Sequence, residues 1–411
     1  MQDFFQLPIV IISMSRWDGD YSSTSWSLAK TFAKTQPVIY VDYPYTWTEF
    51  VRKKKTPSVQ RRQSALLFKK SALISLQQYQ NSLYALTPPL MIPDNWLSRG
   101  SMYEFIKNMN NKALYRSIKN ALKQLGHKDY ILINAFNPLY LCKPPKDPDL
   151  KAYIYQSQDN IRALEMYLRK HGSNAEILAI QNSDLSIATS KQLQEDLTGL
   201  SGIKVEYLPN AADFEVFKRA YVEQMDLPED LKGIAHPIIG YTGNICHRVD
   251  YNKINTLCKA HPEKNVVMIG PRNHAGHTRI DLDAIPNLYF LGPKKLEALP
   301  AYLAHFDLLI LPFLCNEVTK SIYPLKINEY LASGKPVVAT PFSEDIKSFG
   351  HLISLEQEDL DFASAIDKEL RDDSPEKRAK RHTEASINTW DARVNAFWDL
   401  MGKVKEFRNK F

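Results

Sequence analysis

Two successive series of short β-branched segments, each followed by a helical pattern, constrain the fold of this chain more than any other feature. The first series begins with the apolar run at residues 9–14, and the second begins at residues 238–242. Strands that alternate with helices in this way are typical of parallel α/β units. The other predicted strands are residues 38–42, 130–133, 153–156, 185–189, 205–208, 265–269, 288–291, 308–312 and 336–340. The predicted helices are residues 24–34, 249–260, 296–304 and 322–333.

Two such series predict two Rossmann-like domains. We place the first at residues 1–209 and the second at residues 210–386. Residues 387–411 are predicted to form an amphipathic helix that packs back across both domains. Ligands of open parallel sheets bind beyond the carboxyl ends of the strands, so the cleft between two facing domains is the expected site.

Composition limits the class of protein. Hydrophobic residues make up 44% of the 411 residues and charged residues 24%, which is ordinary for a globular chain. No apolar run approaches the roughly 20 residues that a spanning helix needs, and the N-terminus lacks the pattern of a secretory signal. The cysteines are scattered without C-x-x-C spacing, which favours a reduced, cytoplasmic setting without disulfides or zinc. The four are Cys142, Cys246, Cys258 and Cys315.

A basic stretch at residues 52–70 stands out from the formal net charge of +6, because no acidic residue interrupts it. Such blocks are solvated faces or mobile loops in many proteins. The alternative is attraction to an anionic membrane surface or to a phosphorylated acceptor. No nucleic-acid-binding motif lies beside it, so nucleic acid is not an expected partner. Its cations are Arg52, Lys53, Lys54, Lys55, Arg61, Arg62, Lys69 and Lys70.

Four motifs in the C-terminal half give the most specific indication of function. They are LPNAADFEVF at 208–217, GYTGNICHRVD at 240–250, FLGPKKLEALPAYLAHFDLLILPF at 290–313 and YPLKINEYLASGKPVVAT at 323–340. Together they resemble the donor half of the retaining GT-B glycosyltransferases that build bacterial cell-surface polysaccharides. The resemblance covers residues 205–400 and is only architectural before them. It implies the GT-B fold, an α/β architecture of two facing Rossmann-like domains with a cleft between them.

The resemblance also implies a site for a nucleotide sugar, and the residue types suit that ligand. A diphosphate is bound by helix N-termini, close backbone and cations. Lys326 falls in the first turn of the helix that begins at Pro324, and Glu329 lies one turn further, where it could accept both ribose hydroxyls. Gly243 lets backbone approach phosphate, and Arg248 is a second cation. The predicted donor-binding set is Gly243, Asn244, Ser321, Pro324, Leu325, Lys326 and Glu329. Ser321 departs from the family, much of which has a glutamate there.

The catalytic set implied by the resemblance is Lys326, Arg248 and Asp159. Relatives have no convincing protein nucleophile, so the task of the protein is to stabilise charge on the leaving diphosphate. For the acceptor we predict contacts from the loop after the first strand, through Trp17, Asp18, Gly19 and Asp20. An ordinary loop or N-cap role is the alternative for each of these residues and for Asp159.

Two D-x-D patterns and a pair of histidines have the spacing of metal ligands, and we interpret them as chance. Asp281 and Asp283, like Asp147 and Asp149, form D-x-D patterns that lack the domain context of a metal-dependent transferase. His274 and His277 have ligand spacing, but no third ligand joins them. We expect no cofactor and no required metal.

The predicted activity is therefore transfer of a sugar, with retention, from a UDP- or GDP-sugar to a hydroxyl of a glycan or lipid-linked acceptor. The expected setting is cell-surface polysaccharide synthesis, in the cytoplasm or peripherally at the inner face of the membrane. Two alternatives remain open: a nucleotide-sugar epimerase of similar fold, and a catalytically silent relative that binds a nucleotide sugar. Ser321 is the best support for the silent relative.

Overall fold

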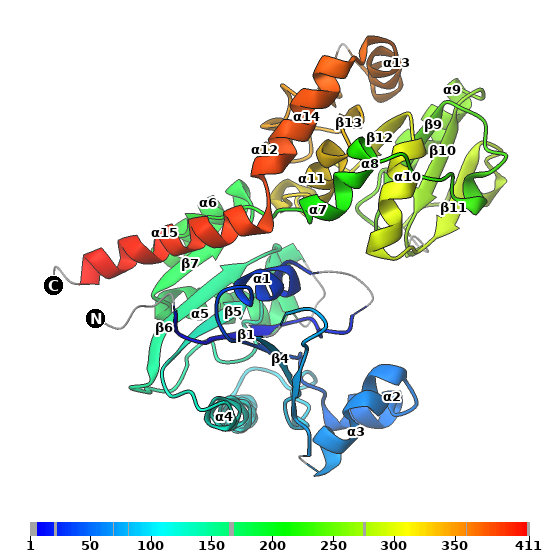
Figure 1. Ribbon diagram of the computed structural model, residues 1–411. Helices are drawn as coiled ribbons and strands as arrows, with labels where there is room; N and C mark the ends of the chain where they lie inside the picture. The colour runs from blue at the N-terminus through cyan, green and yellow to red at the C-terminus, as the bar shows by residue number, and fades with distance from the viewer. Residues whose placement is uncertain are drawn as a thin grey trace. The chain divides into compact units, whose positions relative to one another are not determined.

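The computed structural model describes residues 6–19, 23–68, 70–80, 82–163, 168–273, 277–358 and 360–408, with side chains as far as residue 404. It divides into two compact units (Figure 1). The N-terminal unit comprises Met1–Leu208 and Val394–Phe411, and the C-terminal unit comprises Pro209–Arg393. Within the described part of the chain, no helix is long and apolar enough to cross a membrane.

The N-terminal unit is built on an eight-stranded sheet with the order β3-β4-β2-β1-β5-β6-β7-β8. All pairs are parallel except β3 with β4. The central strands are buried along their whole length, as their continuous apolar runs predict. The strands are β1 (Ile9–Ser13), β2 (Val38–Val41), β3 (Leu73–Ser75), β4 (Leu83–Leu86), β5 (Tyr130–Ala135), β6 (Leu150–Ser157), β7 (Leu185–Ala188) and β8 (Glu206–Tyr207). The strands predicted in this half are confirmed, whereas β3 and β4 were not predicted.

Helices cover both faces of this sheet (Figure 1). The long helix α4 packs Leu114, Ile118 and Leu122 against side chains of β1, β2 and β5. The basic stretch falls largely within two helices, α2 and α3, rather than in a mobile loop. The helices are α1 (Thr24–Phe32), α2 (Trp47–Lys53), α3 (Pro57–Phe68), α4 (Ser101–Gln124), α5 (Ser173–Asn182) and α6 (Lys191–Ser201), with short turns η2 (Ile161–Ala163) and η3 (Leu168–Gly172).

The C-terminal unit has a six-stranded parallel sheet with the order β11-β10-β9-β12-β13-β14. The strands predicted there are confirmed, and β9 and β10 have the predicted bounds. They are β9 (Ile238–Thr242), β10 (Asn265–Ile269), β11 (Leu288–Gly292), β12 (Leu308–Leu311), β13 (Val337–Ala339) and β14 (Ser354–Leu355). Its helices up to Asp372 are α7 (Phe214–Phe217), α8 (Arg219–Val222), α9 (Tyr251–Ala260), α10 (Leu299–His305), α11 (Leu325–Ala332), α12 (Glu344–Lys347) and α13 (Phe362–Asp372). The 3-10 turns are η4 (Glu229–Leu231), η5 (Leu282–Ala284), η6 (Leu296–Ala298) and η7 (Thr319–Ser321).

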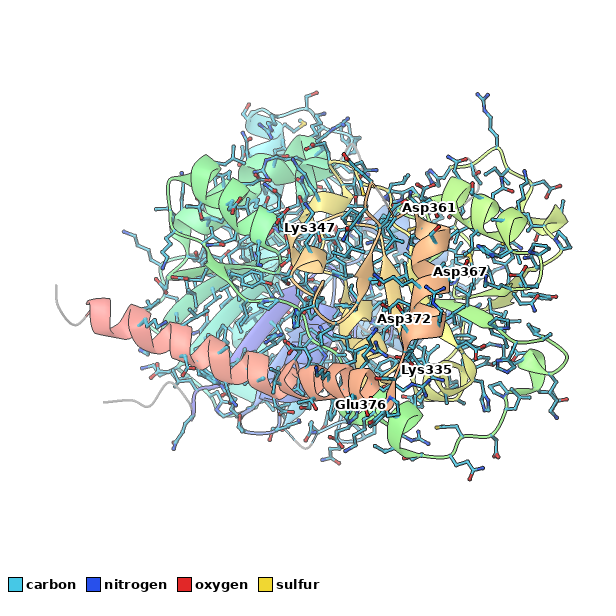
Figure 2. The ribbon with its side chains drawn as sticks, turned by 90° about the horizontal axis from the view of Figure 1, so that it is seen from above. Lys335, Lys347, Asp361, Asp367, Asp372 and Glu376 are labelled. Carbon is cyan, nitrogen blue, oxygen red and sulfur yellow. The ribbon has the colours of Figure 1, made fainter. Side chains whose placement is uncertain are left out.

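Polar contacts at the surface fix the peripheral helices of this unit. Asp361 caps α13 by accepting a hydrogen bond from Ser364 N, and Asp367 on the same helix pairs with Lys264 (Figure 2). Lys335, which follows the end of α11, donates to the carbonyl of Ala304 at 2.7 Å. These contacts tie surface helices to the strands and loops beneath them.

The chain ends with α14 (Pro375–Ile387) and α15 (Trp390–Arg408). Helix α14 packs on α11, and its buried Arg381 donates to the carbonyl of Gly334 and pairs with Asp373. Phe397 and Trp398 of α15 make edge-to-face contacts with Phe32 of α1, with ring centroids 5.1 and 5.9 Å apart. The end of α15 therefore belongs to the core of the N-terminal unit.

Candidate functional site

The order of strands in the C-terminal unit defines a switch point between β9 and β12. From these two neighbours the chain proceeds to opposite edges of the sheet, and ligands of such sheets bind at the carboxyl ends of the strands at this point. The two loops that leave the strands are joined by backbone hydrogen bonds. Asp250 N donates to Pro312 O at 2.7 Å, and Leu314 N donates to Arg248 O at 2.9 Å. The glycine loop and the segment before α11 thus form one connected edge.

Gly243 stands where no other residue would fit. Its φ is +134°, and a Cβ atom placed on it would lie 1.8 Å from Cε of Lys326. Gly270, which follows β10, has a φ of +145°. A Cβ atom placed on it would clash with the carbonyl oxygen of Gly243, at 1.8 Å. The side chain of Lys326 therefore lies directly over the backbone at the end of β9, as the predicted phosphate site requires.

Helix α11 begins later than predicted. Residues 322–324 are not helical, because Pro324 is the N-cap, with extended backbone at φ −76° and ψ 114°. Lys326 is then the second helical residue, so its predicted place in the first turn is confirmed. Asn210 Nδ2 donates to Tyr323 O at 3.3 Å, and Asn328 Nδ2 donates to Tyr323 Oη at 3.0 Å. Asn210, in the motif at residues 208–217, thus holds Tyr323, which directly precedes the N-cap of α11. The motif alone did not reveal this role.

Three charged side chains interact electrostatically at this edge. Lys326, Glu329 and Arg248 are each half-buried. Burial lowers the pKa of Lys326, and nearby Arg248 lowers it further, although Glu329 acts in the opposite direction. Burial likewise raises the pKa of Glu329, against the effect of Lys326. Within the described residues Lys326 Nζ makes no ion pair closer than 4.0 Å, so an anionic ligand would relieve its unfavourable desolvation.

Tyr330 supports the site from below and was missed at the level of sequence. It is fully buried, and its hydroxyl accepts a hydrogen bond from Thr242 N at 2.9 Å. Tyr330 lies on the buried face of α11, so it links that helix to Thr242, the last residue of β9. This bond fixes the position of Gly243 relative to α11.

The other predicted donor residues lie around the same edge. Asn244 is exposed and its Oδ1 accepts a hydrogen bond from Asn273 at 2.9 Å. Ser321 is fully buried in η7, Pro324 is buried and Leu325 is half-buried. Arg248 Nε lies 3.5 Å from Sγ of Cys246. All seven predicted donor residues therefore fall on the two loops and the start of α11.

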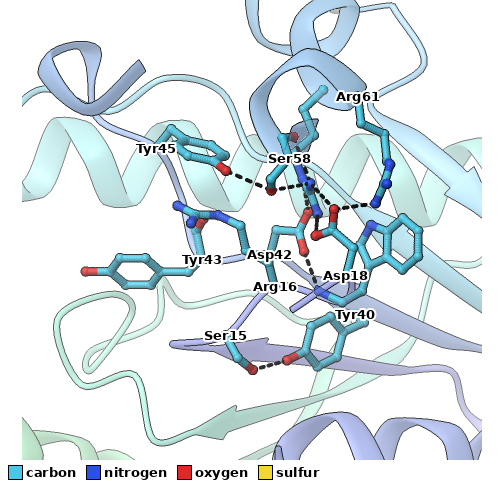
Figure 3. Close-up of polar contacts among 11 residues, drawn as sticks. Ser15, Arg16, Asp18, Tyr40, Asp42, Tyr43, Tyr45, Ser58 and Arg61 are labelled. Atoms are coloured by element: carbon cyan, nitrogen blue, oxygen red, sulfur yellow. Dashed lines mark hydrogen bonds and ion pairs between the residues drawn. The ribbon is translucent and has the colours of Figure 1, made fainter. Parts of the chain in front are cut away.

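The predicted acceptor loop follows β1, and Asp18 in it is buried in an ion-pair network (Figure 3). Asp18 pairs with Arg61 and Arg62, each at 2.5 Å, and Arg62 also pairs with Asp42 at 2.7 Å. Burial raises the pKa of Asp18, but the two arginines outweigh it and hold that pKa below its usual range. Asp18 thus holds the loop onto α3, and its contact with an acceptor stays a prediction.

The neighbours of Asp18 in the loop are placed by the same network. Trp17 N donates to Asp42 Oδ1 at 3.0 Å, and the guanidinium of Arg61 lies 5.4 Å from the centroid of the Trp17 ring. Gly19 N donates to Arg16 O, while Asp20 lies outside the described residues. Arg62, expected as a surface cation, is instead buried with only 3% of its side chain exposed. That expectation was wrong for Arg62 because its acidic partners come from other parts of the chain.

A cluster of hydroxyl groups lies at the switch point of the N-terminal sheet, between β1 and β5. Ser15 Oγ lies 2.5 Å from Tyr40 Oη, 2.9 Å from Ser23 Oγ and 3.0 Å from Ser13 Oγ. Ser25 joins through Ser13, and Gln158 after β6 donates to Ser25 at 3.1 Å. Asp159 is the half-buried neighbour of Gln158. Serines that are scattered in the sequence carry no motif, so this cluster was not predicted.

Three carboxylates of the D-x-D patterns form ion pairs with protein cations. Asp147 and Asp149 both pair with Lys119, and Asp283 pairs with Arg272. His277 lies beside His247, with ring centroids 5.4 Å apart, while His274 lies outside the described residues. In the described part of the chain, no three histidine, cysteine or acidic side chains are grouped so that they could hold a metal ion.

The segment that carries this site matches a known protein family. Residues 236–372 match the family model described as Glycosyl transferases group 1. The matched segment lies wholly within the C-terminal unit and contains β9, α11 and both loops of the switch point. This part of the chain is similar to the group 1 glycosyltransferases. The family resemblance read from the four motifs is thereby confirmed.

Similar structures show that this chain has the GT-B fold. Sucrose-phosphate synthase from Thermosynechococcus elongatus aligns over 98% of this chain and 100% of its own, with a TM-score of 0.66 at 14% identity. The Anabaena protein Alr3699/HepE, solved in complex with UDP and glucose, aligns over 96% of this chain and 100% of its own, with a TM-score of 0.58 at 14% identity. At these identities the likeness establishes the fold alone.

A curated relative is the Bacillus subtilis (strain 168) protein that bears the name teichuronic acid biosynthesis glycosyltransferase TuaH. It is 26% identical over 252 residues, which are 59% of this chain and 62% of the relative. The match thus spans less than two thirds of the relative's length.

Proposed function

We propose that this protein transfers a glycosyl group from a nucleotide sugar to a hydroxyl of an acceptor, with retention of configuration. The observation that carries the proposal is the position of Lys326 over Gly243 at the β9/β12 switch point, beside Arg248 and the N-terminus of α11. Lys326, which forms no ion pair in the part of the chain that the structure describes, suits a diphosphate together with a glycine backbone and the N-terminus of a helix. The family of the C-terminal unit and the UDP complex of the Anabaena structure favour a UDP-sugar as donor, with a GDP-sugar as the alternative.

The residues of the site would act on the leaving group. The bond between the anomeric carbon and the diphosphate oxygen breaks, and a bond from the same carbon to the acceptor oxygen forms. The acceptor proton passes to the departing phosphate, so no protein base is needed. Lys326, Arg248 and the start of α11 would stabilise the charge that grows on the diphosphate. Neither a cofactor nor a metal is part of this proposal.

The hydroxyl cluster at the β1/β5 switch point supports a saccharide acceptor. Ser15 and Ser23 are half-buried, so their hydroxyls lie near the sheet edge where ligands bind. Hydroxyl groups both donate and accept, which suits the similar groups of a sugar. We therefore place the acceptor beside Ser15 and Gln158, with Asp159 and the Trp17 loop next to them. Cell-surface polysaccharide synthesis is the setting that the name of the Bacillus relative favours.

Glu329→Gln is expected to weaken UDP binding by roughly tenfold, because a carboxylate accepts ribose hydroxyls more strongly than an amide does. Calorimetric titration with UDP and 2′-deoxy-UDP provides the measurement, and the wild-type protein should prefer UDP. Glu344→Gln is the matched control, since Glu344 is exposed on α12 and pairs only with Lys347 among the described residues. Equal affinity of the wild-type protein for the two nucleotides would remove Glu329 from the ribose site.

Incubation with a panel of UDP-, GDP- and ADP-sugars tests the activity and separates it from the two alternatives. The proposal expects slow release of free nucleotide in the absence of acceptor, as water replaces the hydroxyl. Conversion of the nucleotide sugar to an epimer without release would instead identify an epimerase. Tight binding without either product would identify a silent relative, which Ser321 favours because it stands where much of the family has a glutamate.

Attachment to an anionic membrane through residues 52–70 is the second part of the proposal. Arg52, Lys54, Lys55 and Lys70 are exposed, whereas Lys53 and Arg61 are paired with acids. Lys69 lies outside the described residues. Exposed apolar side chains flank these cations on α2 and α3, namely Trp47, Val51 and Phe68. Such a surface suits peripheral binding at the inner face of the cell membrane.

Changing both Lys54 and Lys55 to serine is expected to weaken binding to anionic vesicles by roughly 10- to 30-fold, since each cation near the surface contributes about 1 kcal/mol. Vesicle sedimentation at low salt is the measurement. A double change of Lys143 and Lys146 to serine removes the same charge from another exposed segment of this unit and serves as the control. Equal binding of the two variants would disprove attachment through residues 52–70 and leave the transferase proposal intact.

A further inference from the structure

A cavity of about 440 Å³ lies in the N-terminal unit, between α3, α4 and the β3–β4 hairpin. Its volume falls in the range of small-molecule sites. One part of its lining is apolar, with Ala65, Leu73 and Leu86, and the other part is polar, with Arg116, Ser117 and Asn120 of α4. Figure 1 shows α3 and α4 on the same side of the sheet. None of the residues assigned above to the donor or acceptor lines this cavity.

An exposed apolar stripe on α4 leads to the cavity. Met102, Phe105 and Met109 are 63%, 65% and 44% exposed. Their spacing of three and four residues places them on one helix face, and the same spacing continues to Ala113 and Arg116 in the cavity wall. From Met102 to Arg116 this face runs for about 21 Å at 1.5 Å per residue. The stripe and the cavity are therefore one continuous surface.

The polar end of this surface is positively charged. Arg116 is exposed, and no carboxylate in the described residues lies within ion-pair distance of it. Lys119, on the same helix, is paired with Asp147 and Asp149, which leaves Arg116 as the cation in the cavity wall. The guanidinium of arginine is suited to bidentate hydrogen bonds with a phosphate. Charge at this end of the track thus favours an anion.

The shape of the track decides between a helical protein partner and a chain-like ligand. The side chains of Met102, Phe105 and Met109 span only about 60° of the helix circumference. A helix that packs against another protein element uses an apolar stripe of about 100° or more. A narrow apolar track that ends in a cavity with an unpaired cation matches a molecule with one flexible apolar chain and an anionic head.

We propose that this surface binds one phosphate-bearing amphiphile, with its apolar chain along Met102, Phe105 and Met109 and its phosphate at Arg116. The cavity adjoins Thr87 and Pro89, just after the carboxyl end of β4, which is the sheet edge that also holds the hydroxyl cluster. Binding at this surface is independent of the transferase reaction, so each can fail without the other.

The test is calorimetric titration of the full chain with dihexanoyl phosphatidic acid below its micelle concentration. Saturable binding of one molecule is expected, and Arg116→Ala should weaken it by roughly tenfold, the scale of a lost charged hydrogen bond. Lys143→Ala removes one exposed cation elsewhere and should change nothing. Ala113→Trp, which fills the cavity, should abolish binding, while Ala113→Ser should leave it nearly unchanged. Thermal unfolding of each variant checks that the fold persists.

Two further titrations identify the ligand and its source. Inorganic phosphate alone should bind far more weakly, and equal affinity for phosphate would overturn the amphiphile assignment. Binding to anionic vesicles distinguishes the two sources of the amphiphile. If the ligand is a membrane lipid, Ala113→Trp and Arg116→Ala should weaken vesicle binding as well. If the ligand is a free amphiphile, vesicle binding should be the same in these variants as in the wild-type protein. The proposal is wrong if Arg116→Ala and Ala113→Trp both bind dihexanoyl phosphatidic acid as tightly as the wild-type protein does. It is also wrong if the wild-type protein does not bind this lipid.

Discussion

Replacing Lys326 with alanine is expected to lower turnover by roughly 10²–10³, the scale on which loss of one preorganised charge stabiliser reduces kcat. The reason is that Lys326 Nζ lies over Gly243 at the end of β9, where the leaving diphosphate would sit. The fold should persist, because the alanine relieves the cost of burying an ammonium group. Steady-state nucleotide release from the active donor is the measurement, with thermal unfolding to follow stability.

A matched variant separates the site from general charge effects. Lys347→Ala removes one cation from the same unit, but Lys347 is exposed and pairs with Glu344. Its turnover should equal that of the wild-type protein. If Lys326→Ala is as active as Lys347→Ala, Lys326 does not stabilise the leaving group, and the donor must bind elsewhere.

Replacing Arg62 with alanine is expected to destabilise the N-terminal unit by about 3–5 kcal/mol, the usual cost of removing one partner from a buried ion pair. Arg62 joins Asp18 and Asp42, and the three side chains are at most 6% exposed. The alanine leaves two buried carboxylates, of which Asp18 retains only Arg61 as a cation partner. Burial raises the pKa of Asp42 even with Arg62 present, so its charge is costly once Arg62 is lost.

Denaturant unfolding of Arg62→Ala and Arg61→Ala provides the comparison. Arg61 binds the same carboxylate of Asp18, but half of its side chain is exposed. Its removal should therefore cost no more than about 1 kcal/mol. Equal stability of the two variants would show that the network does not hold the loop after β1 onto α3, and Asp18 would again be available as an acceptor contact.

Strands that are buried on both faces were the most predictable part of the fold. The bounds of β9 and β10 were predicted because each is a short, largely apolar segment that is followed directly by a glycine. The beginning of α11 was predicted three residues too early, because the apolar Ile322 and Tyr323 continue the helical pattern. The conformation of Pro324 sets that boundary, and sequence periodicity does not register it.

The donor side of the candidate site was more predictable than the acceptor side, for a physical reason. Gly243 and Lys326 each belong to a local motif, because a strand end and a helix start form from contiguous residues. Arg62 is different, since its partners Asp42 and Asp18 lie 20 and 44 residues away. The hydroxyl cluster likewise unites residues of β1, β2 and the loop after β6. Only tertiary structure brings such residues together.

We expect a nucleotide sugar to bind in the C-terminal unit at the β9/β12 switch point. Hydrogen–deuterium exchange of the full chain, with and without saturating UDP or GDP, tests this most directly. We predict slower exchange in two separate segments, the glycine loop at residues 243–250 and the start of α11 at residues 324–331. Both segments should lose this protection in Lys326→Ala and keep it in Lys347→Ala. Protection confined to the N-terminal unit, or no protection with either nucleotide, would show that a nucleotide sugar does not bind at this switch point.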